Sequence, residues 1–211
     1  MSDVFYNVIV LLGRFPMWVS SRPVVLHRDR IPRTGAFLLA SNHTSAYDIP
    51  ILMRHTPRKL DFVSVREFFA KRSVGWFFRQ MNAFPLERSR SDPKTVRGIL
   101  DHLGQGRAVA MFPEGGFRSE SDSVVHGGSF QSGVGGIARL ANVPIIPVVV
   151  WRSNLYSRLV NYLPLKRVRY GIAFGEGFVV QNEQEAEAQL AQAYRQLFAE
   201  LTQALDKSRS A

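Results

Sequence analysis

The sequence contains no cysteine among its 211 residues. Disulfide bonds, thiolate-ligated metals and a cysteine nucleophile are therefore excluded, and the composition fits a reducing compartment. Acidic side chains are also scarce: 17 Asp and Glu stand against 27 Lys and Arg, which gives a formal net charge of +10 and a pI of about 10.5. Such an excess of positive charge calls for an anionic partner, which can be nucleic acid, an acidic membrane face or an anionic substrate.

Nucleic acid is the partner that this charge most often serves. Here the basic residues are spread along the chain instead of being gathered on one helix, and no recognition motif accompanies them. Nucleic acid is therefore not the expected partner. A phosphorylated lipid at an anionic bilayer fits the scattered charge better.

Long hydrophobic runs are also missing. Residues 4–12 are apolar, but a helix that spans a bilayer needs about 20 such residues, and Gly13, Arg14 and Pro16 interrupt the pattern. The run is not a signal peptide, because no basic residue precedes it and no small-residue cleavage site follows. Two interpretations stay open: a helix packed on the domain, or an interfacial anchor with Arg14 and Trp18 at headgroup level.

A chain of this length suffices for one domain with a full core, and a second domain is not expected. Strand-like and helix-like segments alternate, which predicts a single-domain α/β sandwich with a mixed, mostly parallel sheet flanked by helices. Strands are expected at residues 24–27, 36–40, 60–65, 83–87, 108–112, 145–151 and 168–174. Helices are expected from residue 49, in parts of residues 66–81, from Asp92-Pro93 to Gly104 or Gly106, at residues 137–141 and at residues 183–207, with a loop over residues 121–136.

The chain is organised around residues 40–50, where a buried strand breaks into small polar residues before a helix begins. The pattern places His43 at the strand end and Asp48 about one turn into the helix. The loop between them can let the Asp48 carboxylate fold back onto the imidazole, which would orient the ring and raise the basicity of its free nitrogen. None of the other four histidines has Asp at this spacing. The alternative is a structural histidine.

Three further blocks follow this one in order. Together the four resemble the glycerolipid acyltransferase family, which contains the 1-acyl-sn-glycerol-3-phosphate acyltransferases. The resemblance covers about residues 24–151, and its first and third blocks are the specific ones. The blocks are His43 to Asp48, Phe84-Pro85-Leu86-Glu87-Arg88, Phe112-Pro113-Glu114-Gly115-Gly116-Phe117-Arg118-Ser119 and Val143-Pro144-Ile145-Ile146-Pro147-Val148.

The resemblance implies a reaction: transfer of a fatty acyl group from a thioester of coenzyme A or acyl carrier protein to the free hydroxyl of 1-acyl-glycerol-3-phosphate, which makes phosphatidate. His43 would be the general base, since an imidazole titrates near neutral pH, and Asp48 would orient it. No acyl-enzyme is required, in keeping with the lack of Cys and of a Gly-x-Ser-x-Gly elbow. No cofactor and no metal are expected.

The resemblance also implies a location at the membrane. A lipid-handling enzyme must meet its substrate at the bilayer, so we favour the interfacial anchor for residues 1–22 and assign residues 23–211 to the acyltransferase domain. The expected location is the cytoplasmic face of a membrane, as a peripheral or monotopic protein. The expected partners are the lysophospholipid acceptor, the acyl thioester donor, the anionic membrane surface and, as one donor option, acyl carrier protein.

Substrate-binding residues are carried over from the same blocks. Arg88 is the expected phosphate ligand, because a guanidinium fork matches phosphate oxygens. Glu114 is expected to bind acceptor hydroxyls or to organise Arg118, and Pro113 with Gly115 shapes a tight turn. The full set of substrate-binding residues is Asn42, Arg88, Glu114, Gly115, Arg118 and Ser119.

The chain departs from the usual family pattern at three places. Glu87 stands where a small or polar residue is usual, Gly116-Phe117 lengthen the third block before Arg118, and Gln131 stands near a position where Lys is frequent. These departures keep open a different acceptor, such as a lyso-aminolipid. A thioester hydrolase, in which water replaces the acceptor, and a non-catalytic lipid-binding module also stay open.

Two further patterns carry no function. Residues 133–138 (Gly-Val-Gly-Gly-Ile-Ala) match a dinucleotide-binding fingerprint. The segment follows a loop instead of a strand, however, and Arg158 stands near the position where the fingerprint needs an acidic residue. No cluster of His, Asp and Glu has the spacing of metal ligands.

Overall fold

The computed structural model describes residues 3–65, 69–86, 93–131, 133–157 and 167–210. Its described strands form one eight-stranded sheet in the order β1-β7-β6-β2-β5-β3-β4, with β8 paired to β6. All pairs are parallel except β6 with β7 and β6 with β8. The strands are β1 (Val24–Leu26), β2 (Phe37–Ser41), β3 (Leu60–Val65), β4 (Ala83–Leu86), β5 (Ala108–Met111), β6 (Pro144–Trp151), β7 (Gly171–Phe174) and β8 (Phe178–Val179).

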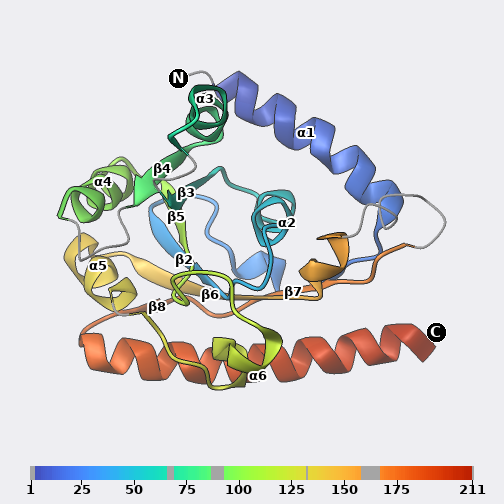
Figure 1. The fold of residues 1–211 in the computed structure, drawn as a ribbon. Coiled ribbons are helices and arrows are strands. Elements are labelled where there is room, and N and C mark those ends of the chain that lie inside the picture. The colour runs from blue at the N-terminus through green and yellow to red at the C-terminus, as the bar shows by residue number, and fades with distance from the viewer. Residues whose placement is uncertain (1–2, 66–68, 87–92, 132, 158–166, 211) are drawn as a thin grey trace.

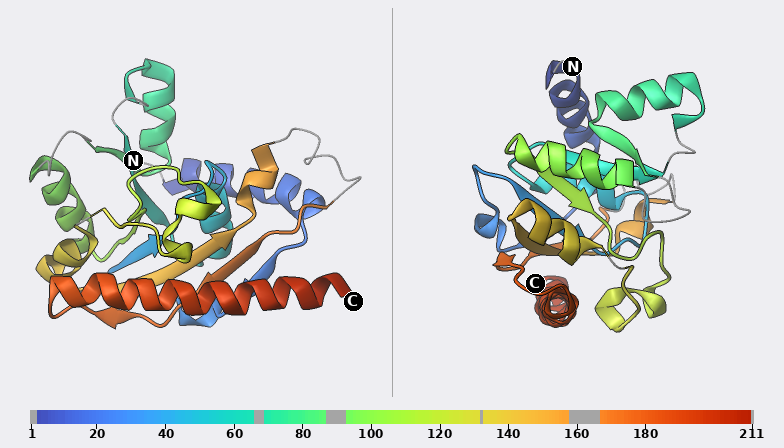
Figure 2. Two further views of the ribbon diagram at one scale, coloured as in Figure 1. Left: turned by 60° about the horizontal axis from the view of Figure 1, so that its bottom comes forward. Right: turned by 90° about the vertical axis from the view of Figure 1, so that its left-hand side faces the viewer.

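Helices cover both faces of the sheet, so the α/β sandwich with a mixed, mostly parallel sheet is confirmed. The helices α1 (Asp3–Ser20) and α2 (Asp48–His55) pack on one face, and α4 (Pro93–Gly104), α5 (Val134–Ala141) and α6 (Glu183–Ser210) pack on the other. Figure 1 shows α6 running along the side of the sheet opposite α1 and α2. The remaining helix, α3 (Arg72–Gln80), rises from the body of the molecule beside the N-terminus (Figure 2).

The strand β2 lies in the middle of the sheet, and the burial pattern explains why. All five of its residues are buried, as expected of a parallel strand that is covered on both faces. Phe37 and Leu39 belong to the core under α1 and α2, whereas Leu38 and Ala40 belong to the core under α4, α5 and α6. The strand is therefore packed against both helix layers of the protein.

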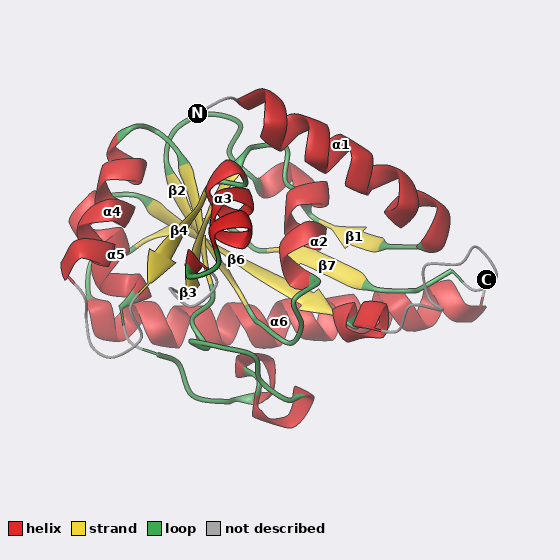
Figure 3. Cartoon of the chain, turned by 45° about the horizontal axis from the view of Figure 1, so that its top comes forward, coloured by secondary structure: helices red, strands yellow, loops and turns green. Residues whose placement is uncertain are grey.

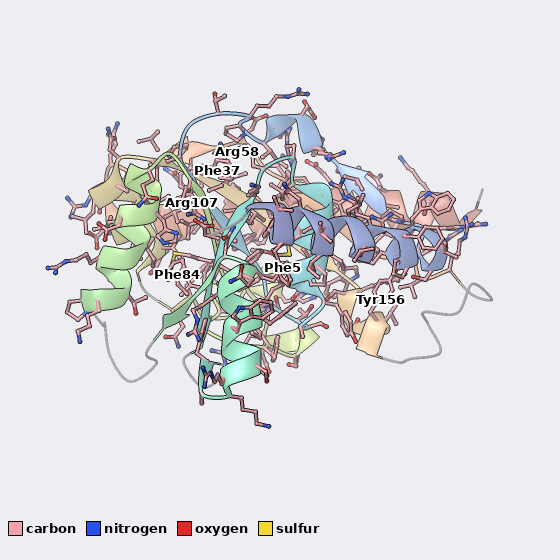
Figure 4. The ribbon with its side chains drawn as sticks, turned by 90° about the horizontal axis from the view of Figure 1, so that it is seen from above. Phe5, Phe37, Arg58, Phe84, Arg107 and Tyr156 are labelled. Carbon is pink, nitrogen blue, oxygen red and sulfur yellow. The ribbon has the colours of Figure 1, made fainter. Side chains whose placement is uncertain are left out.

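The first helix packs on the domain by one side only. Tyr6 and Met17 are buried, and the Tyr6 hydroxyl accepts a hydrogen bond from the Leu60 backbone N–H at 3.3 Å. The neighbouring Phe5 ring meets Trp76 of α3, with the ring centroids 5.2 Å apart (Figure 4). A stripe of large apolar side chains on α1 faces away from the domain and is exposed: Val4, Val8, Leu11, Leu12, Phe15 and Trp18.

The first helix runs unbroken through Gly13 and Pro16 to Ser20, because packing of its inner face outweighs the low helix propensity of single Gly and Pro residues. Several predicted boundaries were wrong. Asp48 is the first residue of α2 instead of lying one turn inside it. The predicted loop ends earlier, since α5 begins at Val134. The two-residue strand β8 was missed, because so short an edge strand has no periodicity to detect.

Within the described part of the chain, no helix combines the length and the apolarity that crossing a bilayer requires.

Candidate active site

The candidate site lies at the edge of the sheet where the parallel strands end. His43 follows the central strand β2, and its neighbours in the sheet are β5 on one side and β6 on the other. The segments after β5 and β6 therefore flank the loop that carries His43, an arrangement in which α/β proteins commonly bind ligands. Figure 3 shows β6 and β7 between α2 and α6, with β2 beside them.

The predicted His–Asp pair is formed. The Nδ1 atom of His43 lies 3.0 Å from Oδ2 of Asp48. The same oxygen accepts hydrogen bonds from the backbone N–H groups of Thr44 at 2.8 Å and Ser45 at 2.9 Å, and Asp48 is fully buried. Because a carboxylate only accepts, the proton is assigned to Nδ1, which leaves the Nε2 lone pair of His43 available as a base.

Two aromatic rings pack against the imidazole of His43. The Phe112 ring stacks on His43 with a centroid distance of 3.8 Å and an angle of 14°, and the Phe117 ring lies at 4.4 Å, tilted by 46°. Phe117 is part of the lengthened third block and is 60% exposed. The sequence analysis gave neither ring a role, although the position of Phe117 as an extra residue in a catalytic block was a usable signal.

Glu114 is buried against the backbone of the loop that carries His43. Its side chain is 1% exposed. One carboxylate oxygen accepts a hydrogen bond from the backbone N–H of His43, and the other accepts from Ser123 Oγ at 2.6 Å and from the Val124 N–H at 2.8 Å. Glu114 thus links the His43 backbone to the segment after the third block. Its contact with acceptor hydroxyls stays a prediction.

Asn42 is also buried and bonded within the protein. Its Nδ2 donates to the Val150 carbonyl oxygen at 2.9 Å, and its Oδ1 accepts from the Val150 N–H at 2.8 Å. The side chain therefore continues the pairing of β2 with β6 beyond Ser41, and it has no exposed surface. Asn42 therefore fixes the start of the loop to β6, and its contact with substrate stays a prediction.

The remaining predicted site residues, Gly115, Arg118, Ser119 and Arg88, lie in different surroundings. Gly115 lines the cavity described below and has φ = 68°, and a Cβ atom there would lie 2.5 Å from Gln131 Cγ, so the turn requires glycine. The Arg118 backbone N–H donates to the His43 carbonyl oxygen at 2.9 Å. Ser119 lies on the surface, where its hydroxyl bonds Asp122 at 2.6 Å. Arg88 lies outside the described residues.

A cavity of about 730 Å³ opens beside His43. Its wall is mostly apolar and comes from three helices, the sheet and the third block, with Arg14 and Arg54 as the cationic members. The wall is formed by Ile9, Val10, Gly13, Arg14 and Met17 of α1, by Ala46, Ile49, Pro50, Met53 and Arg54 in and before α2, by Phe62, Val63, Phe77, Phe78, Met81, Ala83 and Met111, and by His43, Phe112, Gly115, Gly116 and Phe117.

A second polar cluster lies under α1 at the C-terminal end of α2. The Nε2 atom of His55 lies 2.8 Å from the Tyr170 hydroxyl, to which Arg54 donates at 3.3 Å. Burial, helped by the nearby guanidinium of Arg54, lowers the pKa of His55 to about 3, and burial raises the pKa of Tyr170 to about 12. Both groups are therefore neutral near pH 7, and the cluster fastens α2 to the sheet.

Among the described residues, no group of three or more His, Asp and Glu side chains is arranged to hold a metal ion.

Comparison with known proteins points in one direction. The family model described as Acyltransferase matches residues 22–151. A curated 1-acyl-sn-glycerol-3-phosphate acyltransferase of Bacillus subtilis (strain 168) is 22% identical over 184 residues, which is 87% of this chain and 89% of the relative. One of Streptococcus pneumoniae (strain ATCC BAA-255 / R6) is 27% identical over 150 residues, or 69% of this chain and 53% of that protein. The chain thus spans about half the length of the second relative.

The fold also matches a solved structure. The 1-acyl-sn-glycerophosphate (LPA) acyltransferase PlsC from Thermotoga maritima superposes with a TM-score of 0.72 at 20% sequence identity, over 98% of this chain and 80% of that one. At this level of identity, the likeness establishes the architecture.

Proposed function

The chain belongs to the acyltransferase family, and from that premise we propose that it transfers a fatty acyl group from an acyl thioester to the free hydroxyl of 1-acyl-sn-glycerol 3-phosphate, which yields phosphatidate. The names of both curated relatives support this choice of acceptor. The observation that carries the proposal is the His43–Asp48 pair at 3.0 Å, with His43 on the wall of an apolar cavity.

In this mechanism Nε2 of His43 removes the proton from the acceptor hydroxyl as its oxygen attacks the thioester carbonyl carbon. The Asp48 carboxylate holds the Nδ1–H and stabilises the imidazolium that forms. The tetrahedral intermediate then collapses: the carbon–sulfur bond breaks, the new ester bond remains, and the imidazolium returns its proton to the departing thiolate. No covalent acyl-enzyme is needed, because the acceptor attacks the donor directly.

The cavity supplies the binding site for the acyl chain. A volume of about 730 Å³ lies within the range of about 300–1,000 Å³ that is typical of ligand pockets. Its wall of aliphatic and aromatic side chains suits a hydrocarbon chain, whose burial is favourable in proportion to its area. The donor is the thioester of coenzyme A or of acyl carrier protein, and donor titrations will separate the two.

The α1 helix supports a location at a membrane surface. Its exposed apolar stripe continues toward Trp76 and Phe77 of α3, which are 52% and 40% exposed. Contiguous exposed apolar surface marks an interaction site, and the net charge of +10 favours anionic lipid. We expect the enzyme to sit on the cytoplasmic face of a membrane with the cavity between α1 and α2 at lipid level, which would let the acyl chain enter without crossing water.

The test is thiol release from a long-chain acyl-CoA, measured with and without 1-acyl-glycerol-3-phosphate. We expect acceptor-dependent release that falls about 1,000-fold in His43→Ala, as loss of a general base predicts a drop on the order of 10²–10⁴-fold. The matched control is His102→Ala, since His102 is also paired with a buried aspartate, Asp61, at 2.7 Å but does not line the cavity. The control should keep full activity.

Each remaining outcome would redirect the proposal. Thiol release that is independent of acceptor would indicate a hydrolase. Release that appears only with another lysolipid, such as a lyso-aminolipid, would replace the acceptor and keep the chemistry. Lipid binding without release from either CoA or acyl carrier protein thioesters would indicate a non-catalytic module.

A further inference from the structure

One arginine beside the catalytic loop has a backbone conformation that its residue type disfavours. Of the described residues other than glycine, four have positive φ: His27, Asn82, Asn142 and Arg152. Asparagine tolerates this region of φ/ψ space, and the His27 ring is bound by Glu200 at 2.9 Å. Arg152, with φ = 63°, has neither explanation. Strained residues of this kind persist where the surrounding structure holds them, and they cluster at functional sites.

Hydrogen bonds on both sides of Arg152 fix its backbone and join it to the loop that carries His43. On its N-terminal side, Val150 is bonded twice to the Asn42 side chain, at 2.9 and 2.8 Å. On its C-terminal side, the Ser153 hydroxyl lies 3.2 Å from the Thr44 hydroxyl. Asn42 and Thr44 are the two residues on either side of His43. The chain around Arg152 is therefore fastened to both neighbours of the proposed base.

The side chain of Arg152 is half-buried, yet no described residue hydrogen-bonds or ion-pairs with its guanidinium. Arg118 lies on the opposite side of the same loop, since its backbone N–H donates to the His43 carbonyl at 2.9 Å. Because β2 lies between β5 and β6, the two arginines bracket the base from the segments that follow these strands. A partly desolvated guanidinium that no described residue pairs with is a ready site for an anion.

We propose that Arg152 binds the phosphomonoester of the acceptor and so selects an acceptor that carries a phosphate next to the reacting hydroxyl. The inference rests on the proposed function, because the anion that it assigns to Arg152 is the phosphate of the proposed acceptor. In 1-acyl-glycerol-3-phosphate the free hydroxyl and the phosphate are on adjacent carbons. A hydroxyl at Nε2 of His43 therefore brings the phosphate beside the loop, to which the neighbours of Arg152 are bonded through Asn42 and Thr44.

The experiment compares Arg152→Gln, Arg152→Lys and Arg152→Gly with wild type on two acceptors, 1-acyl-glycerol-3-phosphate and the phosphate-free 1-acylglycerol. We expect Arg152→Gln to raise the KM for the phosphorylated acceptor about 10- to 100-fold, to leave the KM for acyl-CoA unchanged and to leave the rate with 1-acylglycerol unchanged. Arg152→Lys keeps a charge and should lose less. Arg139→Gln, which removes an exposed arginine paired with Glu183 on another part of the surface, is the control for net charge.

The glycine variant separates binding from folding. Glycine accepts φ = 63° without strain, so Arg152→Gly should keep a Tm equal to or above that of the wild type while it binds the phosphorylated acceptor as poorly as Arg152→Gln. A merely structural arginine would show the reverse: a lower Tm and an unchanged KM ratio between the two acceptors. That result overturns the inference.

A binding measurement separates this inference from the proposed function. The affinity for 1-acyl-glycerol-3-phosphate in detergent micelles, without any donor, requires no turnover. Weaker binding by Arg152→Gln supports the phosphate site even if the wild type transfers no acyl group. Equal binding by both proteins, or tighter binding by the variant, refutes the site even if His43 proves to be the base.

Discussion

Replacement of Glu114 by glutamine tests whether this side chain holds the catalytic loop or contacts substrate. The carboxylate accepts hydrogen bonds from the His43 N–H, the Ser123 hydroxyl and the Val124 N–H. A carboxamide has the same shape but only one accepting oxygen. If that oxygen keeps the Ser123 and Val124 bonds, the NH2 group faces the His43 N–H, so two donors meet and one charge-assisted bond is lost.

The magnitude follows from those contacts. A hydrogen bond to a charged group contributes about 1.5–3 kcal/mol, and a buried donor left without a partner costs about 1–3 kcal/mol. Because the side chain is 1% exposed, water cannot take over the lost bond. Relief of the buried charge offsets part of this cost, so we expect Glu114→Gln to lower the free energy of unfolding by about 2–3 kcal/mol. For a domain of this size, that is a drop in Tm of roughly 4–12 °C.

The assay combines thermal unfolding with steady-state kinetics. Since the loop carries the proposed base, kcat should fall, while the KM for the acceptor should stay within about 2-fold of wild type because the lost hydrogen bond positions the base and does not contact the acceptor. Glu183→Gln, which removes a half-exposed carboxylate paired with Arg139, is the control and should change stability by at most about 0.5 kcal/mol. A large rise in acceptor KM with an unchanged Tm would refute the reasoning and return Glu114 to the substrate side.

Two further predictions concern other parts of the molecule. The double variant Leu11→Asp with Leu12→Asp changes two positions on α1 that are 65% and 64% exposed. It should reduce sedimentation with anionic phospholipid vesicles at least about 10-fold, because burial of a leucine in the bilayer contributes about 1.5–3 kcal/mol. Leu140→Asp, 63% exposed on α5, is the control, and an equal loss in all variants would exclude α1 as the anchor. The second concerns His55, whose pKa is lowered to about 3 from 6.5, first by burial and then by Arg54. Below pH 6.5 the unfolded chain binds a proton at His55 that the folded protein does not, so this contribution to stability is full above pH 6.5 and is lost as pH falls toward 3. Between about pH 7 and pH 5 the free energy of unfolding should fall by about 2 kcal/mol. This loss should be absent in His55→Gln, and identical pH profiles of urea unfolding for wild type and His55→Gln would contradict the prediction.

The sequence was sufficient for the features that depend on local pattern. Buried strands such as β2 and β6 are continuous apolar runs, and such runs alternating with helical periodicity predict a mostly parallel sheet. The His43–Asp48 contact spans five residues and a loop, so its geometry is set by nearby chain. Residue type, spacing and a turn were enough to anticipate it, and the 3.0 Å separation agrees with that expectation.

The contacts that hold the loop from behind could not be predicted in this way. Glu114 reaches His43 across 71 residues, and Asn42 reaches Val150 across 108. Both side chains are polar and adjoin catalytic residues in sequence, which favoured an interpretation as substrate ligands. Their burial depends on which strands become neighbours in the sheet, and a pattern along one chain carries no information about that.

The order of the strands in the sheet explains why Glu114 and Asn42 are hydrogen-bonded within the protein. Because β2 is central, the segment after it can form hydrogen bonds on both sides. Glu114, after β5, accepts from the backbone N–H of His43, and Val150 of β6 donates its N–H to the Asn42 side chain. Glu114 and Asn42 both use their polar atoms for hydrogen bonds inside the protein. On the flanking segments, Arg118 donates its backbone N–H to the His43 carbonyl oxygen, and Arg152 precedes Ser153, whose hydroxyl lies 3.2 Å from that of Thr44. These contacts make the two arginines the candidates for an anion beside the loop, in addition to Arg14 and Arg54 on the cavity wall.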